Sequence, residues 1–263
     1  MKYKSSRGGG KIVSGAEAIR SGIAPDGGLF VPLDLPQLVL NNIGQSGYVE
    51  LAATVLASVL TDYTAEELAQ CAAAAYAADK FADPAVVPLM PVGNRHVLEL
   101  WHGPTSAFKD MALQIMPHLM SLALTKTAEG ADMLILVATS GDTGKAALEG
   151  FRDVPRTRIL VFYPSEGVSE VQRAQMVTQE GKNVGVIAVE GNFDDAQTGV
   201  KKIFSSTSMR DLLAQKNLKL SSANSINWGR LAPQIAYYFS AYQSLCESGK
   251  LSSGESVNFV VPT

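Results

Sequence analysis

A lysine at the expected start of a helix is the first residue whose position suggests chemistry. Residues 101 to 110 read Trp-His-Gly-Pro-Thr-Ser-Ala-Phe-Lys-Asp and lead into an apolar stretch from Met111 to Ile115. A helix N-terminus favours negative charge, so it favours the neutral and nucleophilic form of Lys109, which could form a Schiff base. A solvated lysine paired with Asp110 is the alternative, and the local sequence alone favours it because most lysines are exposed.

A glycine-rich loop could bind an anion. Thr139-Ser140-Gly141-Asp142-Thr143-Gly144-Lys145 follows an apolar strand pattern and precedes a helix expected to begin near Ala146. Glycines let the backbone approach a ligand, hydroxyl groups donate, and the amides of a helix N-terminus favour a carboxylate or phosphate. The spacing fits neither GxxxxGK[ST] nor GxGxxG. A capped turn without a ligand explains this segment equally well.

A polar cluster follows the expected strand from Leu218 to Ser222. Its members are Asn224, Ser225, Asn227 and Arg230. Arginine carries a fork of donors that suits phosphate, so the cluster could bind a phosphorylated substrate. A polar turn with Arg230 in a structural ion pair is an equally good interpretation.

Short apolar segments separated by helical stretches would position these residues. Four of them read as buried strands: Met133 to Ala138, Arg158 to Tyr163, Val184 to Val189 and Val257 to Val261. Continuous apolar runs of this kind predict an α/β domain with a mostly parallel sheet. Ligands are then expected at the carboxyl ends of the strands.

The first 90 residues follow a different pattern. They are mostly helical, with a strand signal only around Leu29 to Val31 and a helix from Tyr48 to Leu60. Thr64 to Glu67 has the capping-box spacing before an alanine-rich helix, and these two helices should pack together. Pro84 and Pro88 indicate a linker. We therefore predict a helical domain over residues 1–90 and an α/β domain over residues 91–263.

Composition excludes several classes of protein. The chain has 263 residues, 46% hydrophobic residues and a formal net charge of -3, which argues for a globular fold and against a nucleic-acid partner. No apolar run has the roughly 20 residues needed to span a membrane, so we expect no membrane partner and a soluble, cytoplasmic protein.

The cysteines and histidines suggest structural roles. Cys71 and Cys246 are expected in helices as packing residues, which fits a reducing compartment. The spacing of His and Cys predicts no metal site. His102 should stabilise a turn, His96 should be exposed, and His118 should lie in a core or beside the kink at Pro117.

Several long motifs in one order carry a family resemblance. His102 to Asp110 and Ser140 to Gly144 resemble the cofactor-lysine motif and the substrate loop of threonine synthases. The resemblance extends over nearly the whole chain. Its further motifs are Ala24 to Pro32, Tyr163-Pro164 with Gly167 to Ser169, Gly191 to Asp195, and Asn224 to Arg230.

This resemblance implies a three-layer, tryptophan-synthase-beta-like α/β fold of type II, incomplete at its C-terminal end. It also implies pyridoxal 5'-phosphate as cofactor and conversion of O-phospho-L-homoserine and water to L-threonine and phosphate, by a monomer or homodimer. Lys109 would be the catalytic residue and would bind the cofactor together with Phe108 and Asp142. The substrate-binding residues would be Thr139, Ser140, Gly141, Thr143, Gly144, Asn224, Ser225, Asn227 and Arg230.

The end of the chain departs from the family pattern. The expected strand Val257 to Val261 is followed only by Pro262 and Thr263, without the crossover that a central strand requires. In the family, the glycine-rich loop for the cofactor phosphate and the partner of the pyridine nitrogen come later in the chain. We therefore expect a fragment that binds cofactor weakly or not at all and is inactive alone.

Two other functions stay open. Another enzyme of the same fold type, such as a serine or threonine dehydratase, a cysteine synthase or a threonine-synthase-like phospholyase, would share the lysine and the glycine loop. The motif Asp26-Gly27-Gly28-Leu29-Phe30-Val31-Pro32 favours threonine synthase among these. The third possibility is a domain that binds a small ligand without turnover.

Overall fold

A four-stranded parallel sheet organises the second part of the chain. The structure is a computed structural model that describes residues 1–38 and 47–261. The strands lie in the order β7-β6-β5-β8, and each pairs in parallel with its neighbour. Their bounds are β5 (Asp132–Ala138), β6 (Thr157–Pro164), β7 (Val184–Val189) and β8 (Leu218–Ser222). Four of the five expected strands of this domain are confirmed.

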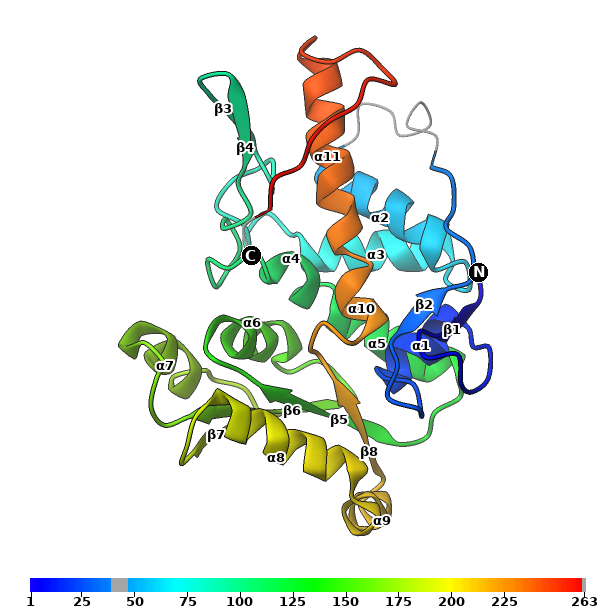
Figure 1. Cartoon of the computed structure of the whole chain (residues 1–263), viewed down its shortest axis with the longest axis vertical. Helices are drawn as coiled ribbons and strands as arrows, with labels where there is room; N and C mark the ends of the chain where they lie inside the picture. The colour runs from blue at the N-terminus through cyan, green and yellow to red at the C-terminus, as the bar shows by residue number, and fades with distance from the viewer. Residues whose placement is uncertain (39–46, 262–263) are drawn as a thin grey trace.

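Helices cover both faces of this sheet, as Figure 1 shows. Along β5, Met133, Ile135 and Val137 join the large core beneath α6 (Asp142–Phe151). The alternating residues Leu136 and Ala138 instead pack with residues of α8 (Phe193–Ser205), because successive side chains of a strand point to opposite faces. The expected three-layer α/β fold is confirmed.

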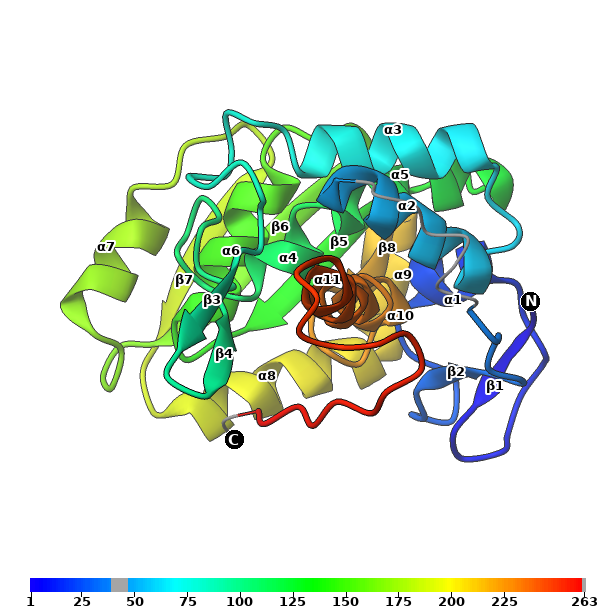
Figure 2. The same cartoon turned by 90° about the horizontal axis from the view of Figure 1, so that it is seen from above.

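The N-terminal helices pack onto the same large core. This region contains α1 (Gly15–Ser21), α2 (Tyr48–Val59) and α3 (Ala65–Ala75), with a small antiparallel pair of β1 (Tyr3–Ser5) and β2 (Phe30–Pro32). Their buried residues form one cluster with those of α5 (Met116–Lys126) and α11 (Gln234–Glu247). Figure 2 shows α2 and α3 beside α5 and α11. The division into domains at residue 90 remains a prediction.

The predicted helix cap before α3 and the predicted packing of α2 on α3 are confirmed. The hydroxyl of Thr64 accepts a hydrogen bond from the Glu67 amide at 3.2 Å, and the Glu67 carboxylate accepts one from the Thr64 amide at 2.7 Å. This is the expected capping box at the start of α3. The rings of Tyr48 and Tyr76 meet edge to face at 5.0 Å, which joins α2 to the end of α3.

The sequence analysis did not predict one β-hairpin. Strands β3 (Leu89–Val92) and β4 (Arg95–Leu98) pair antiparallel around Gly93 and Asn94, and Gly93 has a φ of 61°. A Gly-Asn pair between two short runs is a hairpin signal. Pro91 and the largely exposed positions of both strands hid it, because they give no buried-strand pattern.

The prediction of a buried strand from Val257 to Val261 is wrong. This segment has no strand structure, and Val260 is 93% exposed. A strand needs hydrogen-bonded neighbours, and this segment pairs with no strand of the described residues. Only Phe259 makes a ring contact, edge to face with Tyr238 of α11 at 4.9 Å.

The remaining helices are short or lie at the edges of the sheet. They are α4 (Asp110–Leu113), α7 (Glu170–Val177), α9 (Thr207–Gln215) and α10 (Trp228–Leu231). Helix α6 begins at Asp142, so the expected start near Ala146 is wrong. The polar residues Asp142 and Thr143 read as loop, but they form the first turn of the helix after Gly141.

Cysteines and histidines occupy ordinary structural positions. Cys71 is buried in α3 and Cys246 is half-buried in α11, both as free thiols. Burial raises the pKa of Cys71 to about 12, which keeps the thiol protonated and unreactive. His96 is exposed in β4, as expected. Burial, and secondarily the charge of Lys80, lowers the pKa of His118, which favours a neutral ring.

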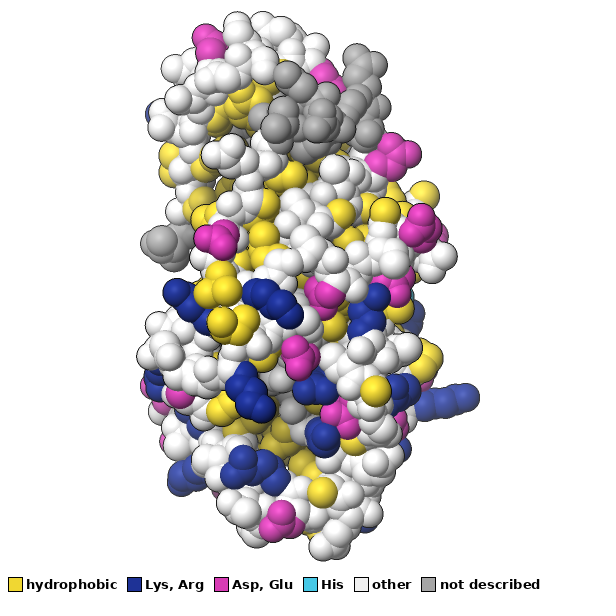
Figure 3. Space-filling model, turned by 90° about the vertical axis from the view of Figure 1, so that its right-hand side faces the viewer, with side chains coloured by type: hydrophobic (Ala, Val, Ile, Leu, Met, Phe, Trp, Pro, Cys, Tyr) yellow, Lys and Arg dark blue, Asp and Glu magenta, His cyan; other side chains and the backbone are white. Residues whose placement is uncertain are grey.

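Charged side chains of both signs share the surface. On the face in Figure 3, Lys and Arg side chains gather over the lower half of the molecule, with Asp and Glu side chains among them. Some of the oppositely charged side chains form ion pairs. The nearly buried carboxylate of Glu129 contacts Lys219 at 2.8 Å and Arg20 at 3.5 Å, which ties α1 to the sheet. Within the described ranges, no helix has the length and apolar character to cross a membrane.

Helices α4 and α6 approach each other closely at Gly150. A Cβ atom added there would overlap the carbonyl oxygen of Leu113, which belongs to the backbone and cannot swing aside. Glycine at position 150 therefore sets the spacing between α4 and α6. These helices begin directly after Lys109 and Gly141, which are two of the expected site residues.

We expect Gly150→Ala to lower the free energy of unfolding by about 2 kcal/mol or more, because the overlap forces the backbone of α4 or α6 to move. The matched control is Gly199→Ala in α8, where an added Cβ meets no atom within 4 Å. That change should raise stability by about 0.5 kcal/mol through helix propensity. Urea denaturation measures both, and equal effects of the two variants would contradict the close approach.

Candidate active site

The sheet has a topological switch point at β5. The chain goes from β5 to β6 and β7 on one side and then returns to place β8 on the other side of β5. At such a point, an open parallel sheet is expected to offer a crevice for a ligand at the carboxyl ends of its strands, here beside the loops after β5 and β8. The two loops are residues 139–144 and 223–227, and both were expected to bind ligand.

Lys109 reaches this crevice from α4. Its Nζ atom lies 3.4 Å from Oδ2 of Asp142 and 4.6 Å from the centroid of the Phe108 ring. The side chain of Lys109 is 21% exposed, whereas the Phe108 residue is 42% exposed. The structure thus brings together the three residues that were expected to bind a cofactor.

Asp110 has a different partner from the one considered in the sequence. It is buried, and its carboxylate accepts hydrogen bonds from the Thr105 amide at 2.8 Å and the Thr105 hydroxyl at 2.7 Å. Burial raises the pKa of Asp110, with partial compensation by these bonds. The pairing of Lys109 with Asp110 is therefore wrong. Asp110 instead closes the turn that presents Lys109, and this role of Thr105 and Asp110 was missed.

The loop after β5 is shaped by one hydroxyl. Oγ1 of Thr139 accepts hydrogen bonds from the amides of Gly141 at 3.0 Å and Gly144 at 2.9 Å, and Thr139 is 2% exposed. Gly141 has a φ of 147°, a conformation that L side chains rarely adopt. Thr139 therefore turns the chain from the strand into α6 from beneath the loop.

This geometry separates the loop donors into two groups. The amides of Gly141 and Gly144 point to Thr139, so they are occupied within the loop. Ser140 is exposed and Thr143 is half-buried, and neither hydroxyl has a hydrogen bond to another of the described residues. The amides of Asp142 and Thr143 lie in the first turn of α6, where N–H groups have no helical acceptor. The available donors are thus at positions 140, 142 and 143.

The cluster after β8 also divides into structural and accessible residues. Asn227 is fully buried, and its amide group donates to the carbonyls of Ile19 and Ser222 at 2.9 Å and accepts from the Gly229 amide at 2.9 Å. Its side chain is therefore fully used in holding β8, α1 and α10 together. Asn224 is half-buried, Ser225 is exposed, and Asn224 reaches the Ala138 carbonyl at 3.5 Å.

Arg230 is the unusual member of this cluster. It is 4% exposed, and its Nε and Nη1 atoms have no hydrogen-bond partner among the described residues. Burial lowers the pKa of the guanidinium to about 10, against opposing effects of Tyr237 and Asp110. The ion pair considered from the sequence is not present among the described residues. Since α10 contacts α4, this buried cation lies close to the helix that follows Lys109.

His102 lies in the segment that precedes Lys109. Among the described residues, it forms no side-chain hydrogen bond or ion pair with another candidate site residue. Its Nε2 atom is 2.7 Å from the Glu99 carboxylate, which agrees with the expected role in stabilising the turn. No group of three or more His, Cys, Asp or Glu side chains in the described part of the chain could hold a metal ion.

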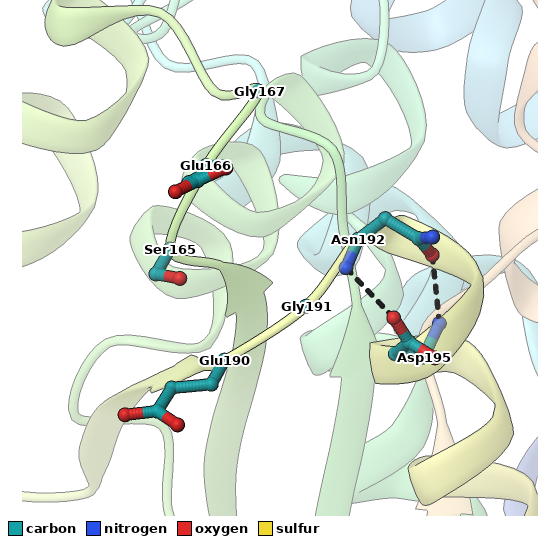
Figure 4. A pocket seen from close by; sticks show the side chains of 7 residues that line it. All are labelled: Ser165, Glu166, Gly167, Glu190, Gly191, Asn192 and Asp195. Carbon is teal, nitrogen blue, oxygen red and sulfur yellow. Dashed lines mark hydrogen bonds between the residues drawn. The ribbon is translucent and has the colours of Figure 1, made fainter.

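A second hollow lies at the carboxyl ends of β6 and β7 (Figure 4). Its lining includes Ser165, Glu166, Gly167 and Glu190, followed by the start of α8. There, the Asn192 and Asp195 side chains point toward each other and form reciprocal bonds with the backbone that cap α8. Two motifs of the family resemblance thus line the same edge of the sheet, beside the crevice rather than within it.

Gln172 was missed in the sequence although it touches the site. Its Nε2 atom donates to Oδ1 of Asp142 at 2.6 Å. A signal existed, because Ser169 and Gln172 have the capping-box spacing before a helix. Nothing in that spacing indicates that the glutamine also reaches another helix.

Comparisons with known proteins show which proteins this chain is similar to. Residues 2–76 match the family described as the threonine synthase N terminus. Threonine synthase of Pseudomonas aeruginosa is 41% identical over 268 aligned positions, which cover 100% of this chain and 54% of that protein. Human threonine synthase-like 1 is 40% identical over 261 positions, with 94% of this chain and 35% of that protein covered. The chain thus spans between about a third and about half of the length of these relatives.

Solved structures agree. A PLP-bound threonine synthase from Brucella melitensis matches with a TM-score of 0.83 and 40% identity, over 93% of this chain and 52% of that one. Yeast threonine synthase matches with a TM-score of 0.82 and 33% identity, over 94% of this chain and 50% of that one. The fold expected from the motifs is therefore that of the corresponding half of threonine synthases.

The double acceptor role of Thr139 can be tested with two variants. Thr139→Val keeps the shape but leaves the Gly141 and Gly144 amides without their acceptor, so we expect a loss of about 2 kcal/mol in stability and faster hydrogen exchange of the loop amides. Thr139→Ser keeps the hydroxyl and loses only a methyl group, which should cost about 1 kcal/mol and preserve the protection of the loop. Equal amide protection in both variants would show that the hydroxyl does not hold the loop.

Proposed function

We propose that this chain, a homologue of the threonine synthases along its whole length, forms part of a PLP-dependent lyase that converts O-phospho-L-homoserine and water to L-threonine and phosphate. The observation that carries this proposal is the position of Lys109. Its amine lies at the switch point of a parallel sheet, between the carboxylate of Asp142 and the ring of Phe108. The identity to threonine synthases over the whole chain supports the substrate.

The residues at the crevice suit pyridoxal phosphate. Lys109 offers a partly exposed amine that can be bound covalently to an aldehyde, with Asp142 beside it to contact a polar group of the ring. Phe108 presents an exposed aromatic ring at the same place. When bound, pyridoxal phosphate supplies a conjugated system that accepts electrons and eases the removal of protons from substrate carbons.

Lys109 would have two roles. It holds the cofactor through Nζ, and the same amine takes and returns protons at the carbons of the substrate once it is released. The tight turn closed by Thr105 and Asp110 restricts the backbone on both sides of Lys109, so the amine keeps its position during these transfers.

The loop after β5 would hold the substrate carboxylate. The hydroxyls of Ser140 and Thr143 and the amides of Asp142 and Thr143 are the available donors, and the N-terminus of α6 adds a favourable field for an anion. We assign Thr139, Gly141 and Gly144 to the shaping of this loop, since their polar groups bind one another. A rigid set of donors orients the substrate without reorganisation during the reaction.

The cluster after β8 would bind the phosphate of the substrate. Arg230 carries donor groups without partners and a charge opposite to that of phosphate. Asn224 and Ser225 lie on the accessible side of the same loop, whereas Asn227 fixes the loop from beneath. Leaving-group binding at this edge would place the reacting carbons between the loop after β5 and Lys109.

A second candidate is a threonine-synthase-like enzyme with another phosphorylated substrate. The 40% identity to human threonine synthase-like 1 favours it specifically, because that relative matches as well as the threonine synthases do. Release of phosphate from O-phospho-L-homoserine with formation of threonine supports the first candidate, and release without threonine supports the second. A monomer or homodimer in the cytoplasm, without a nucleic-acid partner, completes the proposal.

The proposal predicts a selective adduct at Lys109. After incubation with pyridoxal phosphate and reduction with borohydride, peptide mass spectrometry should find the label on Lys109 ahead of the other lysines. Lys145 is the internal control because it lies on α6 with a side chain of similar exposure, at 16% against 21%. Label spread evenly over the lysines, or found on Lys145 ahead of Lys109, would refute the cofactor assignment.

The unpartnered charge of Arg230 predicts a gain in stability on its removal. A buried cation without a partner costs free energy, so Arg230→Met should raise the free energy of unfolding by about 1 kcal/mol and should abolish protection of the chain by millimolar phosphate. Thermal unfolding with and without phosphate measures both effects. A destabilised variant would instead show that Arg230 has a structural role.

A further inference from the structure

Gln172 joins the outer helix α7 to the candidate active site. The carboxylate of Asp142 has two side-chain partners, each on a different oxygen. Oδ1 accepts from Nε2 of Gln172 at 2.6 Å, and Oδ2 faces Nζ of Lys109 at 3.4 Å. The shorter contact is thus with the neutral glutamine, while Asp142 itself is 48% exposed. A half-exposed carboxylate has no packing to fix its rotamer, so the glutamine supplies the directional constraint.

Ser169 determines which end of the Gln172 amide faces Asp142. Oε1 of Gln172 accepts from the Ser169 hydroxyl at 3.0 Å and from the Ser169 amide at 3.4 Å, while Ser169 Oγ accepts from the Gln172 amide at 3.2 Å. Both Ser169 donors require an oxygen at this position, which leaves the NH₂ group to donate to Asp142. The capping box of α7 therefore orients the donor.

Gly141 provides the space that this contact needs. A Cβ at position 141 would lie within 2.6 Å of the side-chain amide of Gln172. The glycine therefore has two reasons to be present, its φ of 147° and the passage of the Gln172 side chain over the loop. The contact belongs to the loop geometry and is more than an incidental surface hydrogen bond.

Helix α7 contacts α6 mainly through one face. Met176 is the single buried residue of α7, and Gln172, Met176 and Gln179 are spaced by one turn each. Gln179 lies two residues beyond the helix, where it bonds to Lys145 and donates to Glu149 at 2.9 Å. Two glutamines thus attach this segment to α6 at separate points, and only the first lies at the site.

We propose that Gln172 is a positioning residue that holds the Asp142 carboxylate against the amine of Lys109, so that the seating of α7 controls the reactivity of this lysine. The inference rests on the proposed function for its catalytic meaning. Without the glutamine donor, the half-exposed carboxylate of Asp142 rotates into water, and the amine of Lys109 loses the contact that holds it in place. Lys109 then becomes more reactive in the absence of cofactor and less well placed in its presence.

The test measures the reactivity of two lysines in two variants. Reductive methylation of the chain with formaldehyde near neutral pH, without cofactor, is followed by peptide mass spectrometry at Lys109 and Lys145. Gln172→Met keeps the length of the side chain but removes the donor. We expect the rate at Lys109 to rise about threefold, the size set by losing a partly exposed ion pair, with Lys145 unchanged. Asp142→Asn should produce at least the same increase at Lys109.

Gln179→Met is the matched control. It removes the other glutamine contact of this segment, so it should change the rate at Lys145 and leave Lys109 as in the unmodified chain. An unchanged Lys109 rate in Gln172→Met overturns the proposal, and so does an equal rise in both glutamine variants, which would indicate general displacement of α7. Because no cofactor is present, this result is independent of whether pyridoxal phosphate forms an adduct at Lys109.

Discussion

The close approach of α4 and α6 is the constraint on which the site depends. At one end, the Leu113 carbonyl lies where a Cβ of Gly150 would be, and at the other end Lys109 meets Asp142. Two helices that touch at both ends can neither slide nor rotate without breaking one contact. The distance between the reactive amine and its carboxylate therefore follows from backbone packing far from the crevice. The side chains of Lys109 and Asp142 then need only small adjustments to align with each other.

Lys109 and Asp142 lie beside the switch point of the sheet. Because β6 and β8 lie on opposite sides of β5, the carboxyl ends of β5 and β8 form the kind of switch point at which parallel sheets bind ligands. Thr139 turns the loop after β5 into α6, and Asn227 fixes the loop after β8 to α1. Both residues use all their polar contacts internally. Rigid buried groups thus support a rim of accessible donors, which is the arrangement that orients a small anionic substrate.

Much of this architecture could be predicted from the sequence, and the failures have physical reasons. The strands β5 and β6 were recognisable because burial leaves largely continuous apolar runs. The same pattern misled at Val257 to Val261, since an apolar run forms a strand only where a neighbour offers hydrogen bonds. The start of α6 was misplaced because its first turn contains Asp142, Thr143 and Gly144, which resemble a loop.

The sequence predicted which segments lie near Lys109, but it did not predict which of their residues have internal partners. Motifs identified Lys109, the loop after β5 and the cluster after β8, and the structure places them at one edge of the sheet. The distinction between Asn227, which is saturated, and Ser225, which is exposed, depends on contacts with α1 more than 200 residues earlier in the chain. The reach of Gln172 from α7 to Asp142 likewise depends on tertiary packing. Local spacing carries no information about such contacts.

The two cationic side chains of the candidate site, Lys109 and Arg230, differ in burial. Lys109 keeps part of its side chain in water, with the carboxylate of Asp142 beside it, so its amine stays accessible to a ligand. Arg230 is nearly inaccessible, yet its guanidinium remains charged near neutral pH even with its pKa lowered to about 10. A permanent charge without a partner has unsatisfied donors that an incoming anion can satisfy, and the desolvation has already occurred during folding. Under the proposed function, Lys109 would serve proton transfer and Arg230 would bind an anion, and the stability lost at Arg230 would be recovered when the anion binds.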